Sequence, residues 1–248
     1  ASRNPAVHYD LGAFAKGYAI DRVNRARGDA VLFEEVYTAY RRAPEVTRRR
    51  IFLETMETIY PDRLSRDEAL AFWLNLYNAG ALDLAAVTAA GSEPSVLRVP
   101  GAFQRMWATV AGENLSLDDI EHGKIRRFRD PRIHGELVCG SASCPTLRHE
   151  PFRGGDLDEQ LEDQMKSFLA GGGATYDPET QRLRLSRIFL WYGADFARPE
   201  RMPAWVPARR KAIARAVSHW LDVEDRSAIA DATVEFNSYD WGLACRIG

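Results

Sequence analysis

The 248-residue sequence has little cysteine, with three in the whole chain. An odd and low number argues against a framework of disulfides, although one bond between two of the three is compatible with the count. Cys139 and Cys144 are spaced more widely than the usual paired zinc ligands, and no second pair completes a set of four. We therefore expect no structural metal.

The sequence also lacks long apolar runs, a strong net charge and the common cofactor motifs. No run is long enough to span a bilayer, and a net charge of −2 favours neither nucleic acid nor an acidic membrane as a partner. Without a glycine-rich phosphate loop or a helix carrying paired histidines, we expect no cofactor. The chain begins Ala1-Ser2 rather than with Met, which is compatible with a removed leader and export to the periplasm. Nothing in the sequence indicates an oligomeric state.

Apolar residues are plentiful, at 46% of the chain, which is enough for a large core. Their helical spacing predicts helices over 9–24, 33–42, 47–60, 66–89, 117–126, 157–169, 187–196 and 207–223. Turn signals predict hairpins over 110–116 and 174–185, and the tail over 233–243 alternates like a strand. With no repeat or linker, we predict one α+β domain over 1–248. It should be mostly helical with a small, largely antiparallel sheet, and residues 1–62 should form an N-terminal helical segment.

The helix predicted over 66–89 is apolar nearly all round, which indicates burial in the middle of the fold. Its polar exceptions are Asn75, Asn78 and Asp83. A buried amide must find hydrogen-bond partners or cost about 1–3 kcal/mol. These side chains therefore either tie neighbouring loops together or orient a catalytic group.

The stretch from His134 to Pro145 is the most informative for chemistry. A short apolar run after His134 predicts a buried strand, and a loop of small residues then places Cys144 directly before Pro145. Because proline is favoured at the first position of a helix, we expect Cys144 at a helix N-cap. The helix dipole would lower the pKa of the thiol there, and the N–H groups that follow would form an oxyanion hole.

Other residues are expected to complete this site. Asn75 or Asn78 could add a side-chain donor to the oxyanion hole, and small residues such as Ser143 would let a substrate approach closely. Cys139 competes with Cys144 as a nucleophile, but its place within the apolar run favours a buried, inert thiol.

Two histidines compete for the role of base. If His134 is the base, the cysteine loop must fold back along about 17 Å of strand, at roughly 3.3 Å per residue. His122 lies on a different element, but its neighbour Glu121 should point about 100° away from it on a helix. We therefore predict Cys144 as the nucleophile and His134 as the base, with Glu121 orienting His134 and His122 just behind them.

Several stretches form a recognisable set in chain order: Phe72–Ala79, Leu117–His122 with Arg126, His134–Pro145, Leu185–Phe189, Trp191-Tyr192, Asp195-Phe196 and Tyr239–Trp241. Together they resemble the bacterial DUF547 family, which is named for lacking a known function. The family is similar to papain- and transglutaminase-like thiol hydrolases, with acid, histidine and cysteine in an altered chain order. The resemblance implies a papain/transglutaminase-like α+β fold and an activity that depends on Cys144.

These observations lead to three functional hypotheses. The first is a cysteine-dependent hydrolase or acyltransferase that acts on a peptide-like amide or thioester through an acyl-enzyme. The alternative is a non-catalytic peptide-binding module, with Trp191, Tyr192 and Trp241 lining a groove. A third, weaker hypothesis is a redox protein that uses Cys139 and Cys144. A peptide or small amide is the expected substrate of the enzyme.

Overall fold

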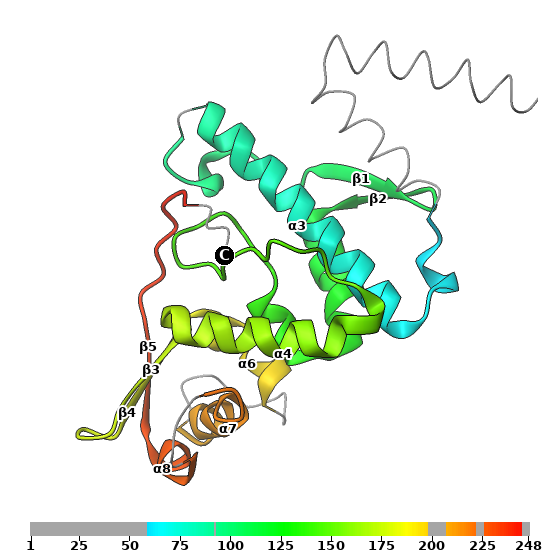
Figure 1. Ribbon diagram of the computed structural model, residues 1–248. Coiled ribbons are helices and arrows are strands. Elements are labelled where there is room, and N and C mark those ends of the chain that lie inside the picture. The colour runs from blue at the N-terminus through cyan, green and yellow to red at the C-terminus, as the bar shows by residue number, and fades with distance from the viewer. Residues whose placement is uncertain (1–58, 92, 198–206, 222–225, 245–248) are drawn as a thin grey trace, which may run out of the picture. The chain divides into compact units, whose positions relative to one another are not determined.

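The computed structural model describes residues 59–248 except 92, 198–206, 222–225 and 245–248 (Figure 1). The helices predicted before Pro61 lie outside the described residues, apart from their last two positions, which are not helical. The described part has an α+β architecture, as predicted. It contains helices, a two-stranded antiparallel sheet and a three-stranded mixed sheet.

Helix α3 (Arg66–Ala90) follows the short 3-10 helix η1 (Pro61–Arg63) and runs through the middle of the described structure. It begins at a capping box, in which the Glu68 N–H donates to the Ser65 side chain and the Ser65 N–H donates to the Glu68 carboxylate. By length and composition α3 is long and apolar enough to cross a membrane, which was not expected from the sequence. However, 56% of its most apolar segment is buried inside the protein, as a core helix requires.

Beside α3 lies a hairpin of β1 (Met106–Val110) and β2 (Glu113–Ser116), preceded by the short 3-10 helix η2 (Val96–Arg98). Positive φ angles at Ala111 and Gly112, of 50° and 81°, allow the tight turn between the strands. The helix predicted over 117–126 is instead a π-helical turn, η3 (Asp119–Lys124), followed by a 3-10 turn, η4 (Ile125–Phe128). At its start the Ser116 N–H donates to Asp119 Oδ2, and the Asp119 N–H donates to Ser116 Oγ.

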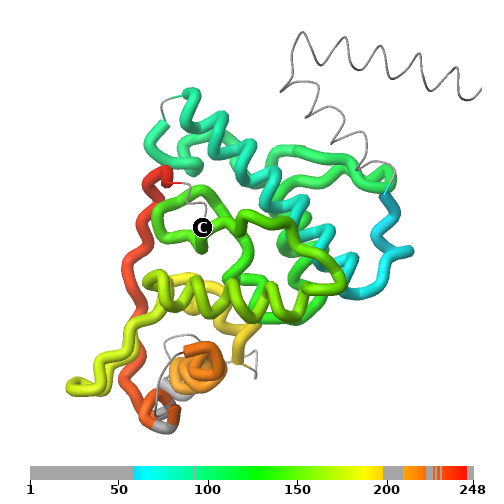
Figure 2. Tube along the Cα trace, in the orientation of Figure 1, coloured from blue at the N-terminus to red at the C-terminus, as the bar shows by residue number. Residues whose placement is uncertain are grey.

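The second part of the core is built around α4 (Leu157–Phe168), which continues into the π turn η7 (Leu169–Gly173). The predicted second hairpin is confirmed by β3 (Ala174–Asp177) and β4 (Arg182–Leu185), and β5 (Thr233–Phe236) joins β4 in parallel. The helix predicted over 187–196 is broken into α5 (Ile188–Trp191) and α6 (Gly193–Phe196). Helices α7 (Pro207–Val217) and α8 (Arg226–Asp231) complete this part (Figure 2).

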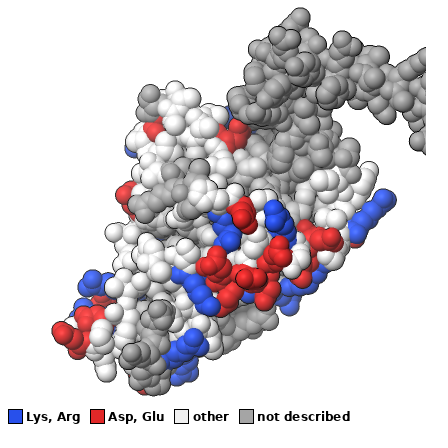
Figure 3. Space-filling view, viewed as in Figure 1, with Lys and Arg blue, Asp and Glu red and all other residues white. Residues whose placement is uncertain are grey.

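Charges on the face that carries α4 are interspersed rather than of one sign (Figure 3). Several are paired: Arg132 with Asp158 at 2.8 Å, and Lys166 with Glu162 at 3.0 Å. The exposed Lys166–Glu162 pair contributes little to stability, and this face offers no large field of one sign.

No strand follows His134, which is a correction to the sequence prediction. His134 lies in the 3-10 helix η5 (Pro131–Gly135), and the chain then runs on without a neighbouring strand. The apolar run does reflect burial, since Val138 is 2% exposed. Its backbone bonds to a side chain of α3 instead: the Val138 N–H donates to Asn78 Oδ1 and Asn78 Nδ2 donates to the Glu136 carbonyl, each at 3.0 Å.

No helix begins at Pro145, so the predicted N-cap at Cys144 is wrong. The next helical turn is η6 (Gly154–Asp156), ahead of α4. The Cys144 N–H donates to the Ser141 carbonyl at 3.1 Å, and Pro145 has no N–H to offer. Between Pro145 and η6 a side chain supplies a hydrogen bond to the backbone, since Gln164 Nε2 donates to the Thr146 carbonyl. The helix dipole and the helix-based oxyanion hole therefore cannot activate Cys144.

Candidate active site

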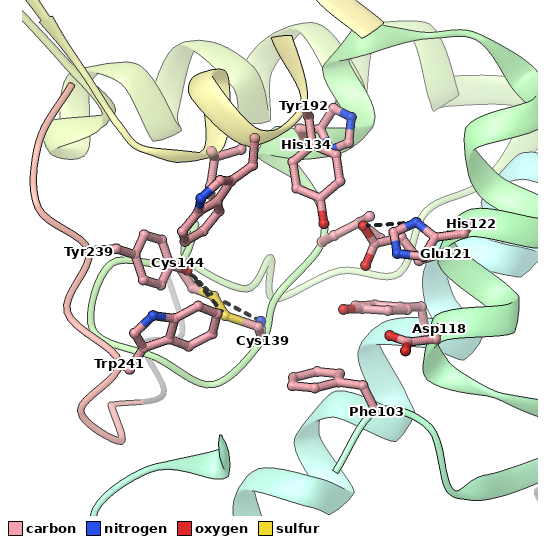
Figure 4. A pocket seen from close by; sticks show the side chains of 14 residues that line it. Phe103, Asp118, Glu121, His122, His134, Cys139, Cys144, Tyr192, Tyr239 and Trp241 are labelled. Carbon is pink, nitrogen blue, oxygen red and sulfur yellow. Dashed lines mark hydrogen bonds and ion pairs between the residues drawn. A yellow bond between two sulfur atoms is a disulfide. The ribbon is translucent and has the colours of Figure 1, made fainter. Parts of the chain in front are cut away.

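A cavity of about 280 Å³ opens between α3, η3, η5, α5 and the segment after β5 (Figure 4). Its lining contains the predicted residues Glu121, His122, His134 and Cys144. The other lining residues are Tyr77, Phe103, Asp118, Leu137, Cys139, Ile188, Trp191, Tyr192, Tyr239 and Trp241. Its size is close to the lower end for small-molecule sites, so it suits one or two residues of a peptide rather than a long segment.

The two sulfurs on the cavity wall are joined, since Cys139 and Cys144 form a disulfide (Figure 4). Cys139 is therefore the partner of Cys144 rather than the inert core thiol that the sequence predicted. Three groups approach Cys144 Sγ: the Cys139 N–H at 2.9 Å, the Tyr239 hydroxyl at 3.3 Å and the Ser141 hydroxyl at 3.4 Å. Hydrogen-bond donors of this kind favour the charged form of a thiol once the disulfide is reduced.

The segment after β5 holds the cysteine loop from the other end of the sequence. The Ala142 N–H donates to the Gly242 carbonyl at 2.9 Å, and the Asp240 N–H donates to Ser143 Oγ at 2.9 Å. Gly140 has a φ of +78°, and a Cβ there would lie 3.2 Å from the Ala85 side chain. The cysteine loop and the segment after β5 are therefore joined by hydrogen bonds, and the loop packs against α3 at Ala85.

Cys144 also lines a second cavity, of about 180 Å³. Small and polar residues form most of its wall: Ala142, Ser143, Thr146, Ser167, Gly171, Gly172, Gly173, Ser186, Asn237 and Ser238, with Phe168. The predicted close-approach residue Ser143 lies here and not in the larger cavity. Cys144 thus faces an aromatic cavity and a polar one.

His134 is paired with a carboxylate that sequence reasoning did not select. Its Nε2 lies 2.8 Å from Asp195 Oδ2, on α6, whereas Glu121 had been predicted as its partner. The His134 ring stacks on Tyr192, with 4.1 Å between ring centroids, and the residue is 3% exposed. Asp195 belonged to the stretches that carry the family resemblance, which was the one signal that could have pointed to it.

Arg126 fixes Asp195 from the other side. Its Nε and Nη2 donate to the two carboxylate oxygens at 2.7 and 2.9 Å, a bidentate geometry. Burial alone would raise the pKa of Asp195, but the hydrogen bonds from His134 and Arg126 outweigh it and hold that pKa well below its ordinary value. Asp195 is therefore a carboxylate at neutral pH and can orient the His134 ring.

Glu121 and His122 form a second imidazole–carboxylate pair. Glu121 Oε1 lies 3.7 Å from His122 Nδ1, although adjacent helical residues were expected to point about 100° apart. The two lie on the π turn η3, and π turns are frequent at functional sites. Glu121 also affects two neighbouring tyrosines. The pKa values of Tyr77 and Tyr192 are raised mainly by burial, and further by the charge of Glu121 and its hydrogen bonds to them.

Within the described part of the chain, neither sulfur has an imidazole nitrogen at hydrogen-bond distance. Figure 4 shows Glu121 and His122 on the wall across from the disulfide. The structure brings the predicted nucleophile and both candidate bases into one cavity but keeps them apart in the disulfide form.

Asn75 and Asn78 do not line the larger cavity. Asn75 makes two bonds of 2.9 Å to the backbone of Phe152, and both ends of the Asn78 amide are bonded to the chain around Glu136. Asp83 accepts from Trp107 Nε1 at 3.1 Å. These side chains tie loops to α3, which was one of the two alternatives left open by the sequence.

Trp191, Tyr239 and Trp241 form an aromatic cluster on the wall of the larger cavity that lies opposite Glu121 and His122. The ring of Tyr239 lies 4.8 Å from that of Trp191 and 4.6 Å from that of Trp241, between centroids. Trp191 is 44% exposed, so the cluster reaches the protein surface. Exposed, packed rings offer a stacking surface for a ligand. Among the described residues, no group of three or more metal-binding side chains is placed to hold an ion.

Fold and site together define an α+β domain with a cysteine pair in an aromatic cavity. Residues 61–169 match the model of the family described as "Protein of unknown function, DUF547", which confirms the predicted resemblance over this segment. No curated protein and no solved structure matches the chain. The matched segment contains Glu121, His134 and both cysteines of the disulfide but ends before Asp195 and the aromatic cluster.

Proposed function

We propose that this protein is a cysteine-dependent hydrolase or acyltransferase that acts on a peptide-like amide or thioester through an acyl-enzyme on Cys144. The observation that carries the proposal is the convergence of three hydrogen-bonding groups on Cys144 Sγ, in a cavity with two imidazole–carboxylate pairs. Such groups stabilise a thiolate, which is the reactive form of cysteine. The likeness to papain- and transglutaminase-like folds is part of this proposal.

The disulfide must open before Cys144 can act. An external dithiol supplies two electrons and two protons and becomes a disulfide, leaving Cys139 and Cys144 as thiols. The proton of Cys144 passes to an imidazole, and the thiolate forms a C–S bond to the carbonyl carbon. The imidazolium then protonates the leaving group as its bond to that carbon breaks. Water or an acceptor amine attacks the resulting thioester and releases Cys144.

We assign the base to His134, with Asp195 as the group that orients it in place of Glu121. The Asp195 bond uses Nε2, which leaves Nδ1 for proton transfer, and Arg126 holds Asp195 in turn. A base held by a fixed carboxylate is the usual arrangement in such triads. The side chain of His122 is 47% exposed, and it serves as the second candidate.

Alkylation by iodoacetamide tests the nucleophile. In the reduced protein we expect Cys144 to label rapidly, with a pKa below the free value of about 8.5, because its thiolate is hydrogen-bonded. Cys139→Ala should keep this behaviour and Cys144→Ala should lose it, with each site followed by mass spectrometry. Slow labelling of Cys144 with an ordinary pKa would defeat the proposal.

The choice of base predicts a difference between two matched variants. His134→Gln should raise the apparent pKa of Cys144 by about 1 unit or more, because it removes the imidazole proposed to take the thiol proton, whereas His122→Gln should leave it close to wild type. The pH dependence of alkylation measures both. The opposite pattern would move the role of base to His122.

The disulfide itself favours a second candidate, thiol–disulfide exchange with a protein dithiol. In that reaction a substrate thiolate attacks one sulfur, and the product is a substrate disulfide plus the two free thiols of this protein. A peptide dithiol that is oxidised repeatedly in the presence of a renewing oxidant would support it. A binding module on the same fold would instead keep its ligand affinity in Cys144→Ser and would form no acyl-enzyme.

A further inference from the structure

The larger cavity combines aromatic walls with two carboxylates, and the two imidazoles of the candidate bases lie in its lining as well. Rings of Tyr77, Phe103 and Trp241 line it, together with the carboxylates of Asp118 and Glu121. No lysine or arginine is among its lining residues. Arg126, whose guanidinium carbon lies 5.4 Å from the centroid of the Tyr192 ring, is already engaged by Asp195.

The negative charge acts within the cavity rather than only at its rim. Besides burial and Glu121, the charge of Asp118 raises the pKa values of both Tyr77 and Tyr192, and at Tyr192 the charge of Arg126 opposes this rise. One oxygen of Asp118 accepts from Gln104 Nε2 at 2.6 Å, which fixes the carboxylate in place. Ionisation of a further acid is therefore opposed here, and a cation is favoured.

The position of the Asp118 carboxylate relative to the cysteines determines where a cationic group of a substrate would lie. Figure 4 shows Asp118 and Phe103 together across the cavity from the disulfide. An acyl group on Cys144 that extends a side chain into this cavity would direct its tip at Asp118 and its stem along the rings. A cation over an aromatic face, next to a carboxylate, gains from both.

We infer that the cavity selects acyl donors with a cationic side chain, a lysine or arginine residue at the attacked carbonyl. The inference rests on the proposed function of Cys144 and names its substrate class. The hydrocarbon stem of lysine or arginine matches the ring walls, and the ammonium or guanidinium group matches Asp118 and Glu121. The leaving group would lie on the side of the smaller, polar cavity, which Cys144 also lines.

The test compares two chloromethyl ketones on the reduced protein, one of Nα-acetyl-lysine and one of Nα-acetyl-norleucine, its uncharged near-isostere. The thiolate displaces chloride and forms a C–S bond, which mass spectrometry locates. We expect Cys144 to react with the lysine probe about tenfold faster, equivalent to roughly 1.4 kcal/mol, and added salt to reduce this preference. Asp118→Asn should remove most of it, whereas Glu179→Gln, at the exposed β3–β4 turn, should not.

Equal rates for the two probes, or a faster norleucine probe, would overturn the inference while leaving the proposed function intact. A separate binding measurement tests the cavity in the case that Cys144 forms no acyl-enzyme. In Cys144→Ala, tryptophan fluorescence should report tighter binding of Nα-acetyl-lysine methylamide than of its norleucine analogue. If that preference holds while no probe labels Cys144 in the wild type, the cavity inference stands and the acyl-enzyme fails.

Discussion

Glu136 is a buried carboxyl group without a partner of its own. It is 1% exposed, and neither side-chain oxygen has a hydrogen-bond partner among the described residues. Burial raises its pKa well above the ordinary value, and Asp130 and Asp163 add to the rise while Arg148 and Arg132 oppose it. Because the folded pKa exceeds the unfolded one, the stabilising contribution of the neutral form is complete at low pH and is lost as pH rises towards the folded pKa.

Replacement of Glu136 by Gln should therefore stabilise the protein most at high pH. Glutamine stays neutral, so the variant avoids the cost of ionising a buried acid, and we expect a gain of about 1–3 kcal/mol in the free energy of unfolding at pH 8. The gain should vanish or reverse at pH 4, where the wild-type acid is also neutral. Urea titrations at both pH values measure it, with the exposed Glu159→Gln as control. A variant less stable than wild type at pH 8 would show that Glu136 has an ionic role.

At the scale of single residues, the sequence predicted which types of side chain meet but not every pairing. Cys144, His134, His122 and Glu121 were selected and do line one cavity. The pairing of His134 with Asp195 spans 61 positions and depends on how α6 packs, which no local pattern reveals. Local spacing also failed for Glu121 and His122, because a π turn replaces the regular helix on which the expected angle was based.

At the scale of elements, the long helices and hairpins were predictable because their signals are local. The capping box of α3 and the turn of the β3–β4 hairpin, where Asp177 accepts from the Glu179 N–H, are contained in four residues each. The structure of the segment from Ile133 to Pro145 was not predictable in this way. Its apolar run indicates burial but does not show which groups form hydrogen bonds with its backbone. In the structure a side chain of α3, Asn78, takes the place of a neighbouring strand.

Loss of the Asn78 amide should therefore affect both stability and the site. Asn78→Ala leaves the Glu136 carbonyl and the Val138 N–H without this partner, and we expect a loss of about 2–3 kcal/mol in unfolding free energy. The loop that carries Cys139 should also exchange its amide hydrogens faster. Denaturant titration and hydrogen exchange measure the two effects. Asn114→Ala, in the exposed β1–β2 hairpin, is the control and should change neither by a comparable amount.

At the scale of the whole molecule, the disulfide should contribute modestly to stability. It joins residues five apart in sequence, so the loop that it closes is short and the entropic stabilisation is about 2 kcal/mol. We expect the reduced protein to stay folded and to unfold at a somewhat lower urea concentration. The double variant Cys139→Ser/Cys144→Ser should match the reduced wild type. Collapse of the fold on reduction would show that the pair is a structural staple rather than a reactive one.

The arrangement of loop and tail has a consequence for how the protein is made and handled. Backbone bonds join the cysteine loop to the segment around Gly242, roughly a hundred positions later. Tyr239 is synthesised 95 positions after Cys144, so until then its hydroxyl cannot approach the sulfurs, and both thiols are open to oxidants and reductants during synthesis. A protein trimmed to residues 61–169 would contain Cys139 and Cys144 but not Trp191, Tyr239 or Trp241. The reactivity of its thiols would therefore differ from that of the cysteines in the complete cavity.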